Sequence, residues 1–161
     1  MDVIKITPHF SLKEMLRSDT GTRLNIDNTP TPQHLKNLTL LCEKVLEPVR
    51  KKFGPVRITS GYRSLALNMA INPMTSTVNR VSKHSIGQAA DFEVRGLSNF
   101  TLAEWCRDNL DYDQIILEFY TPGDQNSGWV HVSFVEGKNR KQLFTAVREN
   151  GRTVYKVGLI S

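Results

Sequence analysis

Two six-residue stretches, QIILEF at residues 114–119 and WVHVSF at residues 129–134, decide how the centre of this chain folds. Apolar side chains occupy every second position in each stretch, which is the period of a strand with one buried face. Most of the residues that separate them, TPGDQNSG at 121–128, are turn formers. The two stretches are therefore predicted to pair as an antiparallel hairpin.

The register of this hairpin follows from the centre of its loop. It pairs residue 119 with 130, 117 with 132 and 115 with 134, and all six are apolar, as a half-buried sheet requires. The same register places Glu118 directly opposite His131 on the other face, with their Cβ atoms ~5 Å apart. A shift by one residue would bury both polar side chains in the core.

Helical patterns dominate the chain before this hairpin. Thr31 and Pro32 supply the cap and first turn of a long amphipathic helix. Pro48 is expected to kink its last part or to end it, and Gly54 stops the run. Shorter helices are expected over residues 12–16 (with Ser11 and Glu14 as a capping box), 65–70 and 101–109, and loops over residues 19–31 and 72–83.

Further strands are expected over residues 56–59, 89–94, 143–147 and 153–157. Asn150-Gly151 lies between the last two and indicates a two-residue hairpin turn. Helices come first and mostly antiparallel strands follow. The predicted class is therefore α+β, with N-terminal helices packed on a mostly antiparallel sheet.

Length and composition indicate one domain over residues 1–161 of a globular protein. No apolar run approaches the ~20 residues of a membrane helix, and the N-terminus lacks the layout of a signal peptide, so synthesis and retention in a cytoplasm are expected. Cys42 and Cys106 are expected to be buried free thiols. The net charge of +5 suits any polyanion, and the chain has no nucleic-acid-binding motif.

Two of the four histidines have contexts that suggest chemistry. His84 lies in SKHSIGQAAD at residues 82–91, where small residues separate it from Asp91 at the start of an apolar strand. A carboxylate entering a buried strand must be paired or bound to a metal. The spacing is compatible with zinc ligands or with a simple Asp–His hydrogen bond. His9 and His34 are expected to be structural or solvated.

The strand that carries His131 adds Glu118 to this picture. If His131 is a zinc ligand, the metal lowers the pKa of a bound water to about 7, and a neighbouring Glu118 can take its proton. The alternative is a cross-strand ion pair between the two side chains. Arg63, in a glycine-containing turn after a strand, suits either a carboxylate or oxyanion of a substrate or a structural salt bridge.

The combined motifs resemble the M15 family of zinc peptidases. The resemblance rests on Ser82-x-His84, on GQAADF at residues 87–92, on Trp129-x-His131 and on ITSGYRS at residues 58–64, and similar motifs cover nearly the whole chain. It implies a fold like those of hedgehog domains and DD-peptidases, with His84, Asp91 and His131 as Zn²⁺ ligands. It also implies that Arg63 helps to bind and polarise the substrate, and that Ser82 lies beside the first ligand. Tyr62 and Trp129, within the matching motifs, are expected near the metal or the substrate, and Glu118 is expected to be catalytic from the hairpin register. One departure is Gly128, which stands where several members carry the catalytic acid; Glu118 is the replacement.

The activity implied is hydrolysis of a peptide bond in the stem peptide of bacterial peptidoglycan. The bond is that of a D-Ala-D-Ala carboxypeptidase or of an L-Ala-D-Glu endopeptidase. Small size, basic charge and the absence of a signal peptide suggest a monomeric phage or prophage lysis enzyme that reaches the cell wall after release or delivery. The alternative is a zinc-binding scaffold of the same fold without catalysis.

Overall fold

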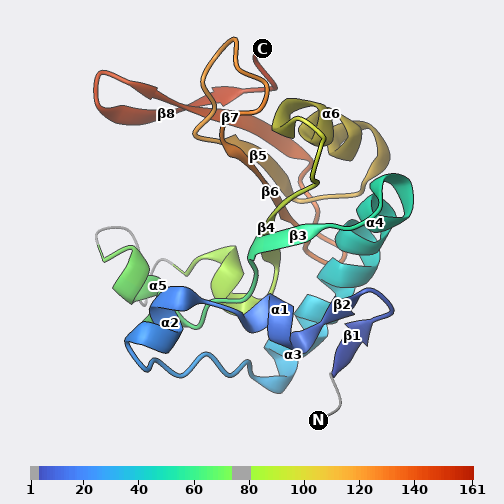
Figure 1. The fold of residues 1–161 in the computed structure, drawn as a ribbon, viewed down its shortest axis with the longest axis vertical. Helices are drawn as coiled ribbons and strands as arrows, with labels where there is room; N and C mark the ends of the chain where they lie inside the picture. Colours follow the sequence, from blue (N-terminus) through green and yellow to red (C-terminus); the bar gives the residue numbers. More distant parts are fainter. Residues whose placement is uncertain (1–3, 74–80) are drawn as a thin grey trace.

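A six-stranded sheet forms the framework of the protein in a computed structural model that describes residues 4–73 and 81–161 (Figure 1). Its strands lie in the order β3-β4-β6-β5-β7-β8, and every neighbouring pair is antiparallel except β5 and β7. The strands are β3 (Arg57–Ser60), β4 (Ala89–Glu93), β5 (Gln114–Glu118), β6 (Trp129–Ser133), β7 (Gln142–Glu149) and β8 (Arg152–Val157). The predicted α+β class with a mostly antiparallel sheet is confirmed.

The N-terminal half supplies a small hairpin and most of the helices. These are β1 (Lys5–Thr7), β2 (Phe10–Ser11), α1 (Leu12–Leu16), α2 (Asp19–Arg23), α3 (Pro32–Leu41), the π-helical η1 (Cys42–Leu46), α4 (Glu47–Phe53), α5 (Leu65–Ile71) and the 3₁₀ helix η2 (Lys83–Ile86). The capping box of Ser11 and Glu14 and the cap at Thr31 are present. The loop expected over residues 19–31 is wrong at its start, where Ser18 caps α2. Residues 74–80 of the other expected loop lie outside the described residues.

The long helix predicted after Thr31 is interrupted just before Pro48. Its middle part, η1, is wound as a π-helix, in which the N–H of Glu47 donates to Cys42 O five residues back. Proline has no N–H and disturbs the α-helical ladder next to it. The wider turn thus lets α4 continue in nearly the same direction to its end at Gly54.

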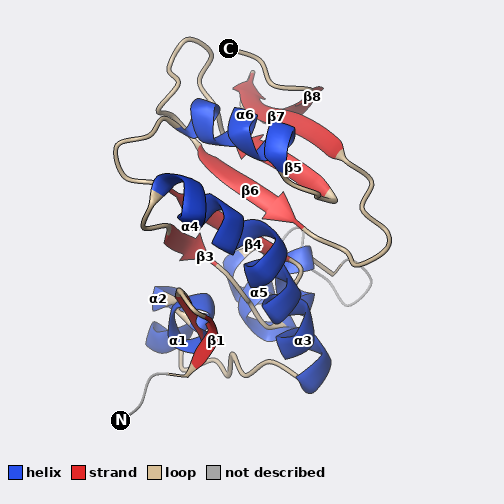
Figure 2. Cartoon of the chain, turned by 90° about the vertical axis from the view of Figure 1, so that its right-hand side faces the viewer, coloured by secondary structure: helices blue, strands red, loops and turns tan. Residues whose placement is uncertain are grey.

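The core lies on one face of the sheet. Figure 2 shows α4 and α6 (Asn99–Asn109) in front of the strands, and the inward side chains of β4, β5 and β6 pack against them. Those side chains are Ala90, Phe92, Ile115, Leu117, Val130 and Val132. Strand alternation sends the remaining side chains of these strands, Asp91, Glu118 and His131 among them, to the opposite face.

The predicted register of the β5–β6 hairpin is wrong by two residues. Ile115 pairs with Val132, Ile116 with His131 and Glu118 with Trp129. The cause lies at Phe119, whose backbone has φ +49° and leaves the strand early, so that the N–H of Tyr120 donates to Ala146 of β7 instead. A slip of two residues preserves the faces. Glu118 and His131 therefore still share a face but lie diagonally across neighbouring strands.

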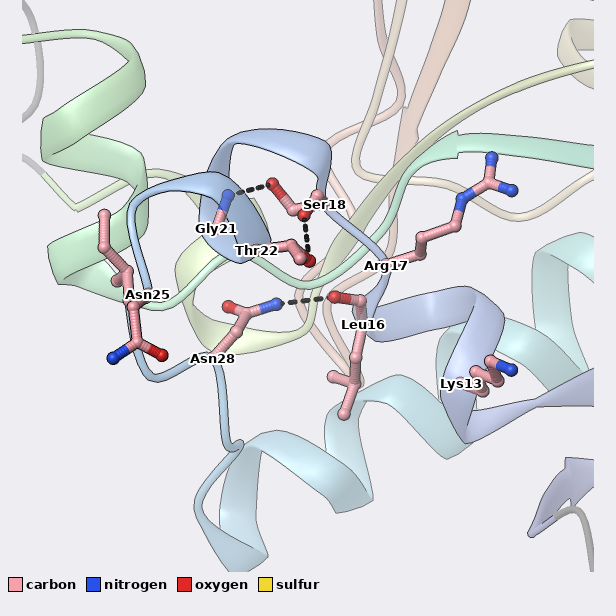
Figure 3. A pocket seen from close by; sticks show the side chains of 9 residues that line it. Lys13, Leu16, Arg17, Ser18, Gly21, Thr22, Asn25 and Asn28 are labelled. Atoms are coloured by element: carbon pink, nitrogen blue, oxygen red, sulfur yellow. Dashed lines mark hydrogen bonds between the residues drawn. The ribbon is translucent and has the colours of Figure 1, made fainter.

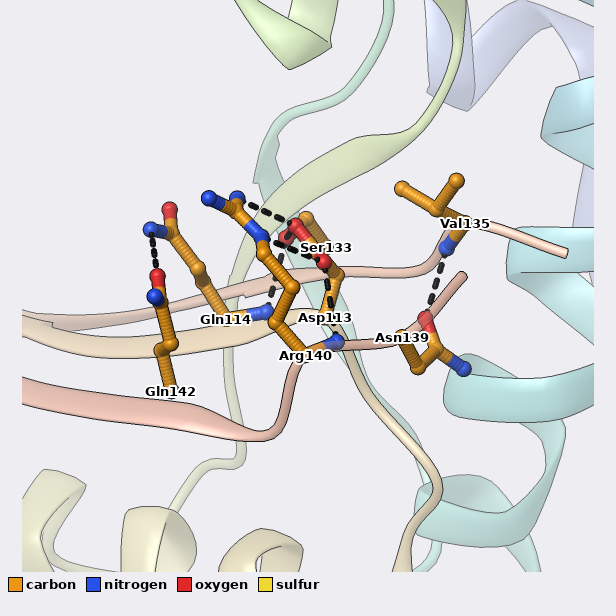
Figure 4. A network of polar contacts seen from close by, with 7 residues as sticks. All are labelled: Asp113, Gln114, Ser133, Val135, Asn139, Arg140 and Gln142. Atoms are coloured by element: carbon orange, nitrogen blue, oxygen red, sulfur yellow. Dashed lines mark hydrogen bonds and ion pairs between the residues drawn. The ribbon is translucent and has the colours of Figure 1, made fainter. Parts of the chain in front are cut away.

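An ion pair between the buried Asp113 and the half-exposed Arg140 fixes the crossover that brings β7 alongside β5 (Figure 4). The carboxylate of Asp113 accepts from Arg140 Nε at 2.9 Å and from Arg140 Nη2 at 2.7 Å, and also from the backbone N–H of Arg140. Gln114 donates to Gln142 across the first pair of residues of the parallel ladder. Arg140, part of a basic cluster in the sequence, is thus a structural residue. It sets the place of the β7–β8 hairpin, whose turn is the predicted Asn150-Gly151 with φ +50° and +76°.

Two further predictions concern the cysteines and membrane-spanning helices. Cys42 and Cys106 are buried free thiols as predicted, and burial raises the pKa of each to about 12. Among the described residues, no helix combines the length and the apolar character needed to cross a membrane.

Candidate metal centre and catalytic site

Three side chains from separate elements converge on the open face of the sheet. His84 comes from η2, Asp91 from the middle of β4 and His131 from the middle of β6, and one donor atom of each lies within 4.8 Å of the other two. Asp91 and His131 are direct partners in the antiparallel ladder, so backbone pairing alone sets them side by side. His84 and Asp91 are buried, and His131 is partly buried.

Backbone contacts orient the His84 ring. Its Nδ1–H donates to the carbonyl of Gly61 at 2.8 Å, which leaves the lone pair of Nε2 directed toward Asp91. Gly61 is required there, since a Cβ would lie 2.4 Å from Met15 O. Ser82, predicted near the metal, accepts from the backbone N–H of His84 and caps η2. This is the arrangement in which the second ring nitrogen of a metal-binding histidine is held by a carbonyl.

The charges of the three side chains balance one another. Burial lowers the pKa of His84, while Asp91 acts in the opposite direction. Burial alone would raise the pKa of Asp91, but contacts with both imidazoles outweigh it and hold that pKa well below the usual range. Burial opposes the imidazolium of His131, yet the hydrogen bond to Asp91, 2.9 Å long, raises its pKa. The carboxylate is therefore ionised at every ordinary pH.

This donor set fits a zinc ion. Two imidazole nitrogens and a carboxylate oxygen are ligands that Zn²⁺ accepts, and catalytic zinc sites use three protein ligands. Bond lengths of about 2.0–2.2 Å in a tetrahedron place ligand atoms roughly 3.3–3.5 Å apart. His84 Nε2 and Asp91 Oδ1 are separated by 3.5 Å, and His131 Nδ1 and Asp91 Oδ1 by 2.9 Å. Small side-chain rotations suffice to match these distances.

Glu118 is the second carboxylate on this face. It is the last residue of β5, and its pKa is raised by burial, which outweighs the favourable effect of His131. A carboxylate with a raised pKa is suited to accept a proton and to return it near neutral pH. The cross-strand pairing with His131 that was expected is replaced by Trp129, whose ring also contacts Phe119 with centroids 5.3 Å apart.

The backbone at Gly128 leaves no room for a catalytic acid three residues before His131. Its backbone has φ +68°, and a Cβ there would lie 2.1 Å from the carbonyl oxygen of Glu118. Asn99 donates to the carbonyls of Asn126 and Gly128 and so holds the end of this loop. The backbone of Glu118 thus occupies the space that a side chain at 128 would need. No pattern in the sequence indicates this role of Asn99.

Arg63 is a partly buried cation without an ion-pair partner in the described part of the chain. Burial lowers its pKa while Asp91 opposes that effect, and its Nε atom has no hydrogen-bond acceptor among the described residues. It lines a pocket of about 270 Å³ together with Arg17 and Ser60, the latter the strand partner of Asp91. A buried guanidinium left in this state is ready to receive an anionic or strongly polar group.

Tyr62 was predicted to lie near the metal or the substrate. Its ring is buried against the core, and its hydroxyl bonds His34 at 3.1 Å. The expected structural role of His34 agrees with this contact, and His9 pairs with Glu47 on the surface. Tyr62 thus supports the turn that carries Arg63.

Asn28 is the support that sequence reasoning missed. Its amide nitrogen donates to the carbonyls of Leu16 and Tyr62, and its amide oxygen accepts from Ser64 N. Figure 3 shows it beside a surface pocket of about 570 Å³ between the α1–α2 segment and the chain that follows. One side chain thus ties three segments together below the metal centre. The sequence signal was the DNTP motif at residues 27–30, which is polar yet ordered.

Comparison with known proteins agrees with this geometry. The sequence model of the family described as Peptidase M15 matches residues 8–133, which include all three metal-site residues, Arg63 and Glu118. No curated protein and no solved structure gives a significant match to the chain. The matched segment is well over half of the chain and carries the whole candidate site. The chain therefore belongs to the M15 family of peptidases.

Proposed function

We propose that this protein is a zinc-dependent peptidase that hydrolyses a peptide bond in the stem peptide of bacterial peptidoglycan. The observation that carries the proposal is the convergence of His84, Asp91 and His131, from three elements, beside a carboxylate of raised pKa. In this proposal the whole chain is one peptidase domain with a fold like those of hedgehog domains and DD-peptidases. It acts as a monomer, without nucleic acid.

His84, Asp91 and His131 would hold the ion. A bound Zn²⁺ supplies a water of lowered pKa and a Lewis acid for the substrate carbonyl. The protein prepares for this by fixing the His84 tautomer through Gly61 and by keeping Asp91 ionised. Those two preparations require no rearrangement of the backbone.

Glu118 and Arg63 would carry the remaining steps. Glu118 takes a proton from the attacking water and delivers it to the nitrogen of the leaving amine. Arg63 donates to the oxygen that becomes negative when the carbonyl is attacked, and a donor of this kind is worth about 10²–10³ in rate. Both groups are partly buried with no opposite charge satisfying them fully, which suits residues whose partners arrive with the substrate.

Stem peptides suit the charge of the site. They carry free carboxylates, and Arg17 and Arg63 line the pocket next to the metal-site residues. Cleavage at D-Ala-D-Ala and cleavage at L-Ala-D-Glu both remain within this proposal because they use the same chemistry. The basic net charge of +5 favours approach to an anionic cell envelope, as a phage or prophage lysis enzyme would need after its release or delivery.

Two measurements on one preparation test the proposal. Zinc uptake by the purified protein should reach one ion per chain, and purified peptidoglycan should then be cleaved. Mass spectrometry of the digest identifies the bond: free D-alanine indicates a carboxypeptidase, and a new D-glutamate N-terminus an L-Ala-D-Glu endopeptidase. Absence of stoichiometric zinc uptake would overturn the proposal.

Glu118→Gln separates the enzyme from the zinc-binding scaffold that is the alternative. The variant should bind zinc as the parent does, while the rate of cleavage falls about 10²- to 10⁴-fold because the general base is lost. If the parent binds zinc but cleaves no type of peptidoglycan, the protein is a zinc-binding scaffold without catalysis.

A further inference from the structure

The open face of the sheet continues past the metal centre as an aromatic surface. The β-sheet register sets Asp91, His131, Ile116, Phe144 and Val157 in one row across five strands. In the next row, Glu118 pairs with Trp129 on one side. Continuing the parallel register by one residue places the small Ala146 on its other side, and Ala146 pairs with Tyr155. Adjacent strands lie ~4.8 Å apart, so Tyr155 lies on the order of 10 Å from Glu118 along this row. We call the rings of Phe119, Trp129, Phe144 and Tyr155 the aromatic face.

None of these four rings belongs to the hydrophobic core. The core side chains and those packed on them come from the opposite face of the same strands, as with Leu143 next to Phe144. Phe119 and Tyr155 are 39% and 55% exposed, and Val157 beside them is 84% exposed. Aromatic rings presented to solvent in a contiguous group mark a binding surface rather than a requirement of folding.

Half of this surface lies outside the region shared with the family. The family match ends at residue 133, whereas Phe144 and Tyr155 belong to the β7–β8 hairpin. Figure 1 shows the tip of that hairpin extending on the side of the sheet away from α4 and α6. The ion pair of Asp113 and Arg140 fixes its attachment. The hairpin therefore adds contacts for a part of the substrate that the shared site does not reach.

Charge indicates which part of the substrate lies there. The pocket on the β3 side of the metal centre is lined by two cations, Arg17 and Arg63, and one carboxylate, Asp19, so its side chains carry a net positive charge. The two rows on the β7–β8 side carry rings and Glu118 but no cation. Arg148 lies on the same face one row farther along β7, where its guanidinium donates to Gly151 O at the hairpin turn. Carboxylates of a peptide therefore belong on the β3 side, and an uncharged group on the aromatic face. The ionised Glu118 also raises the pKa of Tyr155, after the larger effect of burial, which agrees with the closeness of the two side chains.

We propose that the aromatic face is a sugar subsite, on which the glycan part of a muramyl peptide stacks while its peptide extends across the metal centre. Pyranose rings present apolar C–H faces and hydroxyl edges, which match aromatic rings with a polar group such as the Tyr155 hydroxyl. This inference rests on the proposed function and specifies its substrate. The hairpin makes the enzyme prefer peptides that are still attached to sugar.

Binding to the zinc-loaded Glu118→Gln protein tests the subsite without turnover. Calorimetry would compare a muramyl peptide with the same peptide lacking the sugar. Tyr155→Ala in this background should weaken binding of the muramyl peptide about 5- to 30-fold and change binding of the free peptide less than about 2-fold. Tyr155→Phe should keep most of the affinity. The matched control is Lys156→Ala, on the opposite face of the same strand, which should bind both ligands as the parent does.

The outcomes are distinct. Equal losses for both ligands would show that the aromatic face contacts the peptide, and no loss for either would show that it contacts neither; both results overturn the sugar subsite alone. If the Glu118→Gln parent takes up zinc and binds neither ligand, the proposed function fails and the subsite fails with it. A dimer that Tyr155→Ala converts into a monomer would assign the face to a second copy of the chain and overturn the subsite.

Discussion

The candidate metal centre and the two charged residues beside it, Glu118 and Arg63, differ in how their buried charges are compensated. His84, Asp91 and His131 compensate one another, with Asp91 within 2.9 Å of one imidazole and 3.5 Å of the other. Glu118 and Arg63 are also withdrawn from water, but burial is the dominant influence on the pKa of each. The candidate metal-binding cluster is thus compensated within itself, while Glu118 and Arg63 have no ion-pair partner in the described part of the chain. In the proposed function, the substrate supplies their partners.

Removal of the central carboxylate should have the largest effect. Asp91→Ala leaves two imidazoles without their common partner, so zinc uptake and cleavage should both be lost, and the metal-free protein should lose about 1–3 kcal/mol of stability. Inductively coupled plasma mass spectrometry, a cleavage assay and thermal unfolding measure the three effects.

Asp113→Ala is the matched control for this change. Asp113 is also a buried carboxylate held by a neighbouring cation, Arg140, but among the described residues it makes no hydrogen bond or ion pair with His84, Asp91 or His131. The variant should lose stability and keep its zinc. If Asp91→Ala binds zinc as tightly as the parent, the three side chains are only a hydrogen-bonded cluster.

How well the sequence predicts each part depends on how local its determinants are. His84 and Asp91 lie seven residues apart in one motif, and strand alternation placed His131 on the correct face. The position of Glu118 required a long-range register, and the left-handed backbone of Phe119 moved it by two residues. Alternation still kept Glu118 on the metal-site face, because a slip of two preserves every face.

Other features had little local signal. Helix α2, with sequence DTGTR, contains glycine and threonine and shows no apolar period, so only the Ser18 cap and its packing against α5 account for it. Asn28 works through three backbone groups that come together only in the folded chain. Contacts of this kind join distant segments, and single-sequence patterns do not encode them.

The second prediction separates activity from stability at Arg63. Arg63→Met should reduce the rate of cleavage about 10²-fold through loss of an oxyanion donor. The Tm should stay the same or rise, because the change removes a partly buried cation that has no ion-pair partner among the described residues.

Arg140→Met should have the opposite effect on stability. It also removes a guanidinium, but this one is half exposed and neutralises the buried Asp113, which would keep only its hydrogen bonds from the backbone N–H of residue 140 and from Ser133. The loss should be smaller than the about 3–5 kcal/mol of a fully buried pair. The Tm should still fall. A fall of equal size for Arg63→Met would mean that Arg63 has a structural partner and is not held ready for substrate.

The smallest effect is expected from Glu118→Gln on the stability of the metal-free protein. Burial raises the pKa of Glu118 above its value in the unfolded chain, so the folded state keeps the proton to higher pH. As pH rises from the ordinary carboxylate range through this raised pKa, ionisation in the folded state costs stability that the neutral glutamine does not lose. The variant should thus be more stable near pH 7 by about 1 kcal/mol, or roughly 2–4 °C in Tm, and the difference should vanish in acid. Thermal unfolding of both proteins from pH 4 to pH 8 measures this. A variant that is less stable than the parent at neutral pH would mean that the protein already satisfies the Glu118 carboxylate, and the contrast between the metal centre and its flanking charges would then hold for Arg63 alone.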